Sequence, residues 1–444
     1  MGGVNRRGKS RGGRAVVVAS ALCLAVASCS ETVSPPAASS TTTATSKPAT
    51  STAAPAPSVT GPLEKDWKTY GGTAYFGCPD KFSLTKTALD DIRPKVFDTK
   101  TGQYVAPPLP AVPAGETVTG GVCALSGTVD DLKVVYVITT LTPAPQATKA
   151  TAYAFDFKSG QQLATKELQP PTPDLKLADA IQWGLAATSS GVAWLNAFSD
   201  GHAASPPRTV ILSAADLSAS WNDPQPGRVW LDVLSFQRNT EAGKTSGAEL
   251  RRPTGEPIYQ DNDIWTVDSE LSDGPDKLVK ITRRDPHDPK EVSTSFFDLN
   301  AKALIKLGDS ERVSGGGLSA TLSDGKLFVD ALNSGDSQFG FGVWNLRSRQ
   351  WDLLKNRDDA KKASIAKLAF FGDHVYLTNA GGTFAVLALP ATEPVATNWA
   401  VRPFSRISGW TLVCRGETAP QSGGQCKEIV LVQDQDGHYP GPWF

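Results

Sequence analysis

The stretch Thr151-Ala-Tyr-Ala-Phe-Asp-Phe-Lys-Ser-Gly-Gln-Gln-Leu-Ala-Thr165 decides the fold class of this chain. Aromatic and β-branched residues occupy every second position from Thr151 to Phe157, which places them on one face of a half-buried strand. Asp156 can accept hydrogen bonds from the backbone that follows it, and Gly160 can adopt the positive φ that ends such a turn. The stretch therefore predicts two antiparallel strands joined by a tight turn.

Weaker copies of this hairpin recur along the chain, each preceded by an apolar strand that contains an aromatic residue. They lie at 131–160, 191–218, 263–304, 324–348 and 372–389, after an earlier unit made of Thr73–Phe76 and Val96–Val105. Trp410–Cys414 and Ile429–Gln433 form a last hairpin. The interval from Trp221 to Gln260 holds either another unit, around Val229–Leu234, or a long loop.

Serial antiparallel sheets of this kind bury their faces against neighbouring sheets and close into a ring. We therefore expect an all-β chain whose residues 63–444 form a β-propeller of about seven blades, with six or eight also possible. A large sandwich or two stacked β domains is the alternative. Only two short segments, Leu175–Ile181 and Asp358–Lys367, have a helical pattern.

Two copies of the hairpin also resemble a known blade motif. Ala154–Leu163 and Val96–Gly102 are similar to Ala-x-Asp-x-x-Thr-Gly-x-x-x-Trp of quinoprotein-type (PQQ-like) propellers, although the tryptophan is missing from both. The copies at Asp216, Asp298 and Asn345 are degraded. The resemblance implies the propeller fold. Blades of this type occur in quinone-dependent enzymes and also in non-enzymatic scaffolds, including bacterial envelope lipoproteins.

Residues 1–28 have the pattern of an export signal. Five basic residues between Arg6 and Arg14 precede an apolar run, Ala15–Ala27, which is too short to span a bilayer of ~30 Å as a helix. Val26-Ala-Ser-Cys29 resembles the bacterial lipobox, which implies that Cys29 becomes the lipidated first residue of the mature protein. An ordinary cleaved signal is the alternative, and Arg6-Arg7 leaves the choice between Sec and twin-arginine export open.

Residues 29–62 have the composition of a flexible linker. Ser30–Pro62 consists almost entirely of Ser, Thr, Ala and Pro, so it cannot bury enough apolar surface to fold. Such a chain spans on the order of 30 Å when relaxed and ~100 Å when fully extended. With a lipid at Cys29, the linker would hold the folded part at the outer face of the cell membrane.

The charge balance predicts no nucleic-acid partner. The 444 residues include 44 Lys and Arg against 45 Asp and Glu, for a net charge of −1. Beyond the N-terminus the basic residues are spread among acids, whereas a nucleic-acid-binding surface needs a basic patch.

Four cysteines remain in the folded part, and an even number in an exported protein favours disulfides. Cys414 and Cys426 flank a loop between two apolar strands, so we favour that pair, and Cys78 with Cys123 follows by subtraction. A zinc site built from all four cysteines is the rival interpretation, but the paired C-x2-C spacing is missing.

No motif in the sequence predicts catalysis. His202, His287, His374 and His438 form no metal-binding or catalytic pattern, and no nucleophile elbow or phosphate-binding loop occurs. Asp434-Gln-Asp436-Gly437 and Asp261-Asn-Asp263 supply too few oxygens for a calcium site. We expect no catalytic residue, no metal and no cofactor, and we expect most of the 11 tryptophans to lie in the core.

These observations favour a non-catalytic binding or scaffold module in the bacterial cell envelope, anchored through Cys29, with an envelope protein or a glycan as partner. The alternatives are a propeller enzyme, either a quinoprotein-like oxidoreductase or a glycan-active hydrolase, and a sensor or solute-binding subunit. Acids, histidines or tryptophans gathered at one end of the central channel would favour the enzyme. An apolar patch on a blade edge would favour a protein partner.

Overall fold

The computed structural model divides the chain into two units, Met1–Pro55 and Ala56–Phe444, and every described residue lies in the second. The expected signal peptide, Cys29, the segment Leu175–Ile181, His202 and His287 lie outside the described residues. Those described are 58–61, 63, 67–79, 88–143, 148–168, 182–188, 191–197, 208–223, 228–230, 233–239, 245–261, 265–284, 292–307, 313–314, 318–332, 339–380, 384–390, 393–397, 399, 401–416 and 426–440.

The described strands form eight antiparallel sheets, which we number as blades in chain order. Blade 1 contains β1 (Lys68–Tyr70), β2 (Thr73–Phe76), β3 (Lys95–Asp98) and β4 (Gln103–Val105). Blade 2 contains β5 (Thr117–Ser126), β6 (Lys133–Leu141), β7 (Thr148–Asp156) and β8 (Gln162–Leu168). Blade 3 contains β9 (Gln182–Ala187), β10 (Gly191–Ala197), β11 (Arg208–Ser213) and β12 (Ala219–Asp223). Blade 4 contains β13 (Arg228–Trp230), β14 (Val233–Asn239), β15 (Thr245–Arg251) and β16 (Pro257–Asp261).

The second half of the ring repeats this arrangement. Blade 5 contains β17 (Trp265–Asp273), β18 (Asp276–Arg284), β19 (Val292–Asp298), β20 (Ala303–Leu304) and β21 (Val313–Ser314). Blade 6 contains β22 (Ser319–Ser323), β23 (Lys326–Asp330), β24 (Phe339–Asn345) and β25 (Gln350–Asn356). Blade 7 contains β26 (Ile365–Phe371), β27 (His374–Asn379), β28 (Phe384–Ala388) and β29 (Pro394–Ala396). Blade 8 contains β30 (Val401–Ile407), β31 (Trp410–Arg415) and β32 (Glu428–Gln433).

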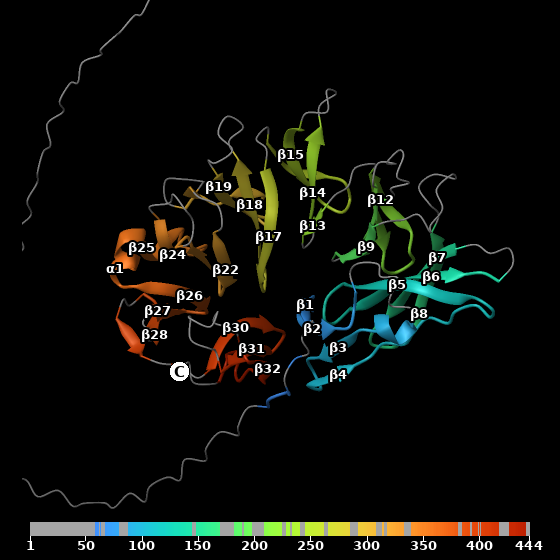
Figure 1. Ribbon diagram of the computed structural model, residues 1–444, viewed down its shortest axis with the longest axis horizontal. Helices are drawn as coiled ribbons and strands as arrows, with labels where there is room; N and C mark the ends of the chain where they lie inside the picture. Colours follow the sequence, from blue (N-terminus) through green and yellow to red (C-terminus); the bar gives the residue numbers. More distant parts are fainter. Residues whose placement is uncertain are drawn as a thin grey trace, which may run out of the picture. The chain divides into compact units, whose positions relative to one another are not determined.

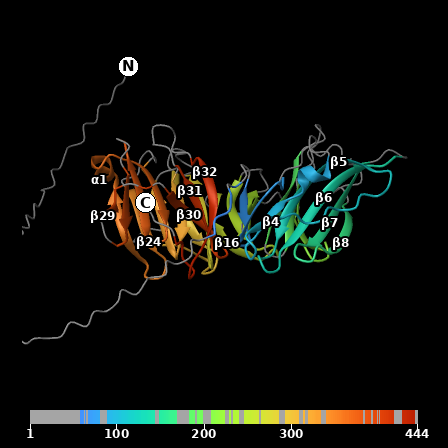
Figure 2. The same ribbon diagram turned by 90° about the horizontal axis from the view of Figure 1, so that it is seen from below.

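Strands follow one another across each blade in chain order, apart from β21, which pairs with β19. Figure 1 shows the blades succeeding one another around a ring, with the first strand of a blade toward the centre. The side view places β5–β8 and β24 at opposite ends of the ring (Figure 2). Within the described residues the fold is therefore an all-β propeller.

The core of the ring is divided among the contacts between blades. Buried apolar side chains form eight clusters in the described residues, and each cluster joins one pair of neighbouring blades. Strand β7 shows how one strand serves two clusters, because Tyr153 and Phe155 pack against blade 1 while Ala152 and Ala154 pack against blade 3. The expectation of a half-buried strand was therefore wrong, since a blade has a neighbour on both faces.

The expected number of blades, about seven, is also wrong, because the structure has eight. The additional blade is β13–β16, which fills the ambiguous interval between Trp221 and Gln260. Its last hairpin turns through Arg252–Glu256, with Gly255 at φ 87°, and lacks the Asp that begins the corresponding turns of blades 1, 2 and 5. Without the Asp signal, the sequence did not separate this blade from a loop.

The Asp turns form as the sequence predicts in blades 1 and 2. The backbone N–H of Gly160 donates to the Asp156 carbonyl, and the Ser159 hydroxyl and N–H both donate to the Asp156 carboxylate. These hydrogen bonds, first the one from the hydroxyl, lower the pKa of Asp156. In blade 3 the same backbone pattern starts at Ser213 and ends at Leu217, so Asp216 lies inside the turn.

Helix α1 (Arg357–Lys362) is the described α-helix, and it is shorter than the segment that the sequence indicated. The Asn356 side chain caps its N-terminus by accepting the N–H of Asp359 at 2.8 Å. Ser364 adopts φ 53°, and the chain then enters β26 at Ile365. The second half of the expected helix is therefore a strand.

The ring closes through an N-terminal segment. We call Ser58–Gly61 the strap. It pairs antiparallel with β32 at Val59–Val432. The Thr60 N–H donates to the Leu431 carbonyl at 3.0 Å, and the Gln433 N–H donates to the Ser58 carbonyl at 2.9 Å. The chain then crosses to β1, so the strap adds to the outer edge of blade 8 before blade 1 begins. Composition assigned these residues to the linker.

Both cysteine pairs that the sequence favours are disulfides in the structure. Cys414 and Cys426 have their Cα atoms 5.5 Å apart at the end of the β31–β32 hairpin. Cys78 and Cys123, with Cα atoms 5.3 Å apart, join the blade 1 segment that follows β2 to β5 of blade 2. The second bridge ties the first blade of the ring to the next one.

Candidate functional site

A cavity lies where the ring closes, between blade 1, blade 8 and the strap, and we call it the seam pocket. Its volume is about 510 Å³. It is lined by Ser58, Val59, Thr60, Gly61, Phe76, Lys95, Lys100, Thr101, Gly102, Tyr104, Trp410 and Gln433. Because these residues come from three separate parts of the chain, the pocket exists only in the closed ring.

The turn between β3 and β4 builds one side of the pocket. The Asp98 carboxylate accepts the Lys100 N–H at 3.0 Å and the Thr101 hydroxyl at 2.8 Å. Burial raises the pKa of Asp98, but these hydrogen bonds outweigh it and the pKa is lowered. The Trp410 indole N–H donates to the Thr99 carbonyl at 2.9 Å, which fixes this turn against blade 8.

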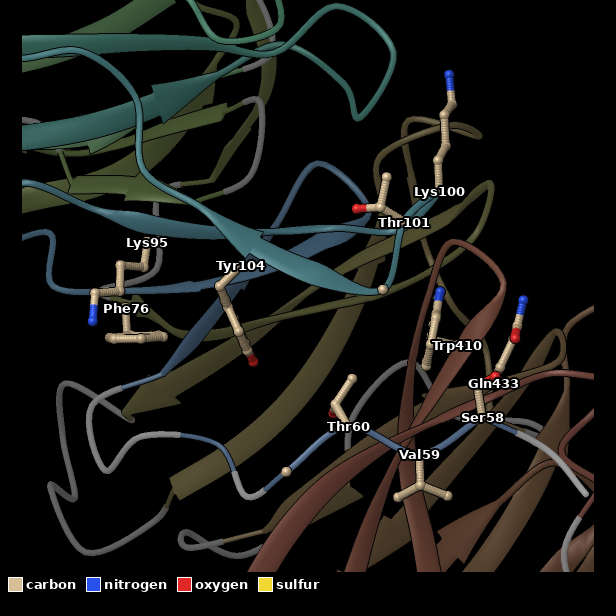
Figure 3. A pocket seen from close by; sticks show the side chains of 12 residues that line it. Ser58, Val59, Thr60, Phe76, Lys95, Lys100, Thr101, Tyr104, Trp410 and Gln433 are labelled. Atoms are coloured by element: carbon tan, nitrogen blue, oxygen red, sulfur yellow. The ribbon is translucent and has the colours of Figure 1, made fainter.

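Aromatic rings form a continuous wall behind the pocket. The ring centroids of Phe76 and Tyr104 lie 5.3 Å apart, those of Tyr104 and Phe97 5.4 Å, and those of Phe97 and Trp410 5.0 Å, all edge to face. Figure 3 shows Phe76 on one side, Trp410 on the other, and Tyr104 and Thr60 extending between them. The wall is fixed because Phe97 and Trp410 are buried in the core of the seam.

The seam pocket has a positive character. Its lining contains two lysines and no Asp or Glu. The Lys95 ammonium lies 5.3 Å from the centroid of the Phe76 ring, and no ion pair joins it to another described residue. Lys100, which is exposed like Lys95, pairs with Asp130 at 3.2 Å and extends away from the other side chains in Figure 3. Lys95 is therefore the cation that is available at the pocket wall.

A smaller cavity of about 240 Å³ lies at one end of the central channel, and we call it the channel pocket. Its walls come from the innermost strands of blades 1, 5, 6, 7 and 8, near their C-terminal ends. It is lined by Thr69, Glu270, Leu271, Ser272, Asp273, Ala320, Thr321, Leu322, Ser323, Phe371, Phe404, Ser405 and Arg406. Two carboxylates and one guanidinium therefore face this space.

The charges at the channel pocket are connected to one another. Arg406 pairs with Asp324 at 2.5 Å and lies over the Phe371 ring at 5.0 Å, while the Asp324 N–H donates to the Asp273 carboxylate at 2.5 Å. Burial raises the pKa of Asp273, and the nearby Asp324 carboxylate raises it further, against the opposing effects of the Asp324 N–H and Arg406. The cluster thus joins the turns of blades 5, 6 and 8.

The described histidines and acidic turns lie outside the lining of both pockets. His374 is half-buried at the start of β27, where burial lowers its pKa, and His438 is exposed. Asp436 and Gly437 form a tight turn closed by Gln435 and His438. The Asp261 carboxylate pairs with Arg283 at 3.3 Å. No group of His, Cys, Asp and Glu suited to a metal ion was found in the described part of the chain.

Tryptophans and exposed apolar residues follow the architecture of the blades. Trp265, Trp344, Trp399 and Trp410 are buried, whereas Trp67 and Trp351 are half-buried. Large exposed apolar side chains are single residues on the strap and on the outer strands of different blades: Val59, Val105, Leu163, Leu354 and Val395. Among the described helices, none is long and apolar enough to cross a membrane.

None of the seam-pocket residues stands out as functional in the sequence. Gly102 and Lys100 belong to a recognised hairpin, and Trp410 and Gln433 to the last hairpin, but no local pattern shows that these hairpins meet. The repeats predict a ring, and a closed ring brings its first and last blades together. Residues 58–61 could have been placed beside β32 on that ground.

Comparisons with known proteins show little similarity. No protein-family model and no curated protein matches the chain. Among solved structures, BamB from Moraxella catarrhalis is 11% identical with a TM-score of 0.36, covering 85% of this chain and all of that one. TolB from Acinetobacter baumannii is 11% identical with a TM-score of 0.24, covering 68% of this chain and 80% of that one. The β-propeller domain of the Trilobed protease from Pyrococcus furiosus is 9% identical with a TM-score of 0.29, covering 73% of this chain and 95% of that one.

At this level of similarity the comparisons carry no inference about activity or partners. The description of the chain rests on its own sheets, their order and the clusters between them. On that ground the part of the chain that the structure describes is an all-β, eight-bladed propeller.

Proposed function

We propose that this protein is a non-catalytic binding module of the bacterial cell envelope, held at the outer face of the cell membrane by a lipid on Cys29. The seam pocket carries this proposal, because it is preformed, walled by aromatic rings and positively charged. Its volume of about 510 Å³ falls in the range of ~300–1,000 Å³ that is typical of ligand sites. In this account residues 1–28 direct export and residues 29–57 form the tether.

The place where the tether meets the ring supports the same proposal. The strap is part of the pocket wall, and residues 30–57 connect it to Cys29 in the sequence. A ligand in the seam pocket would therefore bind within a few residues of the tether. Such an arrangement suits a module that links an envelope component to the membrane surface.

An in-cell cross-link tests the function. Wild-type protein and the Cys29→Ser variant would be cross-linked, purified through a C-terminal tag and analysed for attached protein and attached saccharide. We expect one envelope component to be recovered with the wild type and lost with Cys29→Ser, together with a shift of the variant out of the membrane fraction. Equal recovery from both proteins, or no component with either, contradicts the proposal.

The channel pocket favours a second candidate, a glycan-active hydrolase. Its two carboxylates, Glu270 and Asp273, line one space, and paired carboxylates are what glycoside hydrolysis requires. The Asp324 N–H donates to Asp273, and Arg406 pairs with Asp324 beside it. Release of reducing ends from cell-wall polysaccharide by the wild type, abolished in Asp273→Asn, would establish the hydrolase; no release by the wild type rejects it.

A further inference from the structure

We propose that the seam pocket binds an anionic saccharide, with the aromatic wall under the sugar rings and Lys95 at the acidic group. The inference rests on the proposed function and specifies its ligand. It concerns the residues Phe76, Lys95, Tyr104 and Gln433 together with the strap.

The mixture of side chains in the pocket matches a sugar. A pyranose presents C–H groups on its faces and hydroxyls around its edge, so its site needs flat apolar surfaces next to hydrogen-bonding groups. The pocket supplies the first with Phe76 and Tyr104 and the second with the Gln433 amide. The Thr101 hydroxyl donates to Asp98, and its oxygen can still accept from a sugar hydroxyl. Aromatic rings with a polar neighbourhood are the surfaces that bury one apolar side of a ligand and leave the other in water.

The strap adds backbone groups to this wall. Ser58 and Thr60 direct their backbone groups to β32, and the antiparallel pairing turns those of Val59 to the opposite side. No hydrogen bond joins the Val59 N–H to another of the described residues. An unpaired strand edge at the pocket can therefore donate to and accept from a hydroxylated ligand.

The charge of the pocket selects the acidic form of the sugar. The whole chain carries nearly equal numbers of acids and bases, yet no acid lines this pocket and Lys95 has no described ion-pair partner. A carboxylate, sulfate or phosphate on the saccharide would pair with Lys95 and meet no acid among the residues that line the pocket. The Lys95 ammonium lies 5.3 Å from the centroid of the Phe76 ring, so the same lysine can reach a ligand that stacks on this ring.

The test compares two trisaccharides that differ only in charge. The full-length protein, purified in detergent, would be titrated calorimetrically with β-1,4-linked triglucuronate and with cellotriose, which has the same linkage and no carboxylate. We expect triglucuronate to bind at least tenfold more tightly, and its affinity to fall as salt rises from 50 to 500 mM. Equal affinity for the two, or no saturable binding of triglucuronate, overturns the assignment.

Substitutions of Lys95 test whether triglucuronate binds in the seam pocket. Lys95→Gln should weaken triglucuronate binding about five- to tenfold and leave cellotriose unchanged, because a charge-assisted hydrogen bond is lost. Lys95→Arg should retain most of the affinity. Lys361→Gln, at an exposed lysine on α1, is the matched control and should bind as the wild type does. Unchanged affinity in Lys95→Gln, with an unaltered unfolding temperature, places the ligand elsewhere and refutes the proposal.

The titration and the in-cell cross-link together show whether the ligand class or the proposed binding function is wrong. If triglucuronate fails to bind while the in-cell cross-link recovers a Cys29-dependent protein, the ligand class is wrong and the binding module stands. If both experiments fail, the binding module falls as well.

Discussion

Two glycines with the same backbone angle occupy the same turn in blades 1 and 2, but they meet different neighbours. Gly102 and Gly160 both have φ 69°, in the left-handed region that favours glycine. A Cβ on Gly102 would lie 3.0 Å from the Trp410 ring, whereas a Cβ on Gly160 would lie 3.6 Å from Pro108. Gly102 therefore serves both the turn and the packing of the seam.

We predict that Gly102→Ala destabilises the protein more than Gly160→Ala does. Each alanine is strained by about 1–2 kcal/mol at this φ. Only Gly102→Ala must also displace Trp410, which adds about 1 kcal/mol or more. Urea unfolding of the two variants measures the difference, and equal losses of stability would show that Trp410 does not pack as described.

The turn residues also show what the sequence can predict at single positions. Asp98, Asp156 and Asp298 accept hydrogen bonds from the residues that follow them, as their positions before a turn indicate. Asp216 does so too, and the Ser218 N–H and hydroxyl lower its pKa to about 2, but the turn itself starts at Ser213. Asp marks a turn because its carboxylate accepts hydrogen bonds from the next residues of the chain. These bonds form when Asp is the first residue of the turn, as at Asp156, and also when it lies three residues after the first, as at Asp216.

Asp273 in the channel pocket should make stability depend on pH. Burial, first, and the Asp324 carboxylate raise its folded-state pKa above the unfolded value of ~3.9. The folded protein then binds more protons between these two values, so the free energy of unfolding falls as pH rises through that window. Above the folded-state pKa of Asp273, the buried charged carboxylate lowers the free energy of unfolding by an amount that no longer changes with pH.

We therefore predict that Asp273→Asn raises the unfolding temperature at pH 7, because the amide oxygen can still accept the Asp324 N–H. The gain should shrink as pH falls toward 4, where the wild-type carboxyl becomes protonated. Asp216→Asn is the control of opposite sign, since the pKa of Asp216 is lowered and its charge is favourable at pH 7. Calorimetry at several pH values checks both. A lower unfolding temperature for Asp273→Asn at pH 7 would show that the pairing with its neighbours outweighs its burial.

The strap is the element on which both closure and the seam pocket depend. Three backbone hydrogen bonds tie its region to β32: from Thr60 N–H to Leu431, from Gln433 N–H to Ser58, and from Leu63 N–H to Ile429. Val59 forms the bridge between them and is 44% exposed. A single short strand at an edge is the part of a sheet most easily released.

Proline substitutions at two adjacent strap positions test whether the hydrogen bonds between the strap and β32 hold the ring closed. Thr60→Pro removes the donor to Leu431, whereas Val59→Pro replaces an N–H that is bonded to no described residue. We predict faster hydrogen exchange at the Gln433 amide and a stability loss of about 1–2 kcal/mol for Thr60→Pro, and near-wild-type behaviour for Val59→Pro. Hydrogen exchange read by mass spectrometry makes the comparison, and identical exchange in the two variants would mean that the strap does not hold the ring closed.

Elements were predictable where their partners are close in sequence. The β7–β8 and β31–β32 hairpins and the Cys414–Cys426 bridge each join neighbouring segments, so residue pattern and spacing were sufficient. The β13–β16 interval stayed open between a blade and a long loop because its hairpin lacks the Asp turn. The α1 segment was overextended because the chain from Ile365 pairs with β27, a contact that local helical pattern does not contain.

The ring as a whole depends on contacts between blades that no local pattern reveals. Each described apolar cluster contains side chains from two blades. The cluster at the seam joins Phe97 of blade 1 to Trp410 and Leu412 of blade 8. The sequence predicted a closed ring from its repeats, but the seam pocket combines residues that are more than 300 positions apart, such as Thr60 and Gln433. The combination of aromatic rings and lysines in the seam pocket is therefore visible only in the closed ring.

Site-specific photo-cross-linking in cells tests the central claim, which is that the seam pocket is the binding site. A benzophenone amino acid would be placed, one protein at a time, at Gln433 in the seam pocket, at Thr69 in the channel pocket, and at Leu354 on the outer strand of blade 6. All three positions are exposed to solvent.

We predict an adduct at Gln433 that is reduced by Lys95→Gln and absent at Leu354 and Thr69. An adduct at Thr69 alone would move the site to the channel pocket, and equal adducts at all three positions would show that the seam pocket has no selective ligand. Either result would contradict the assignment of the binding site to the seam pocket.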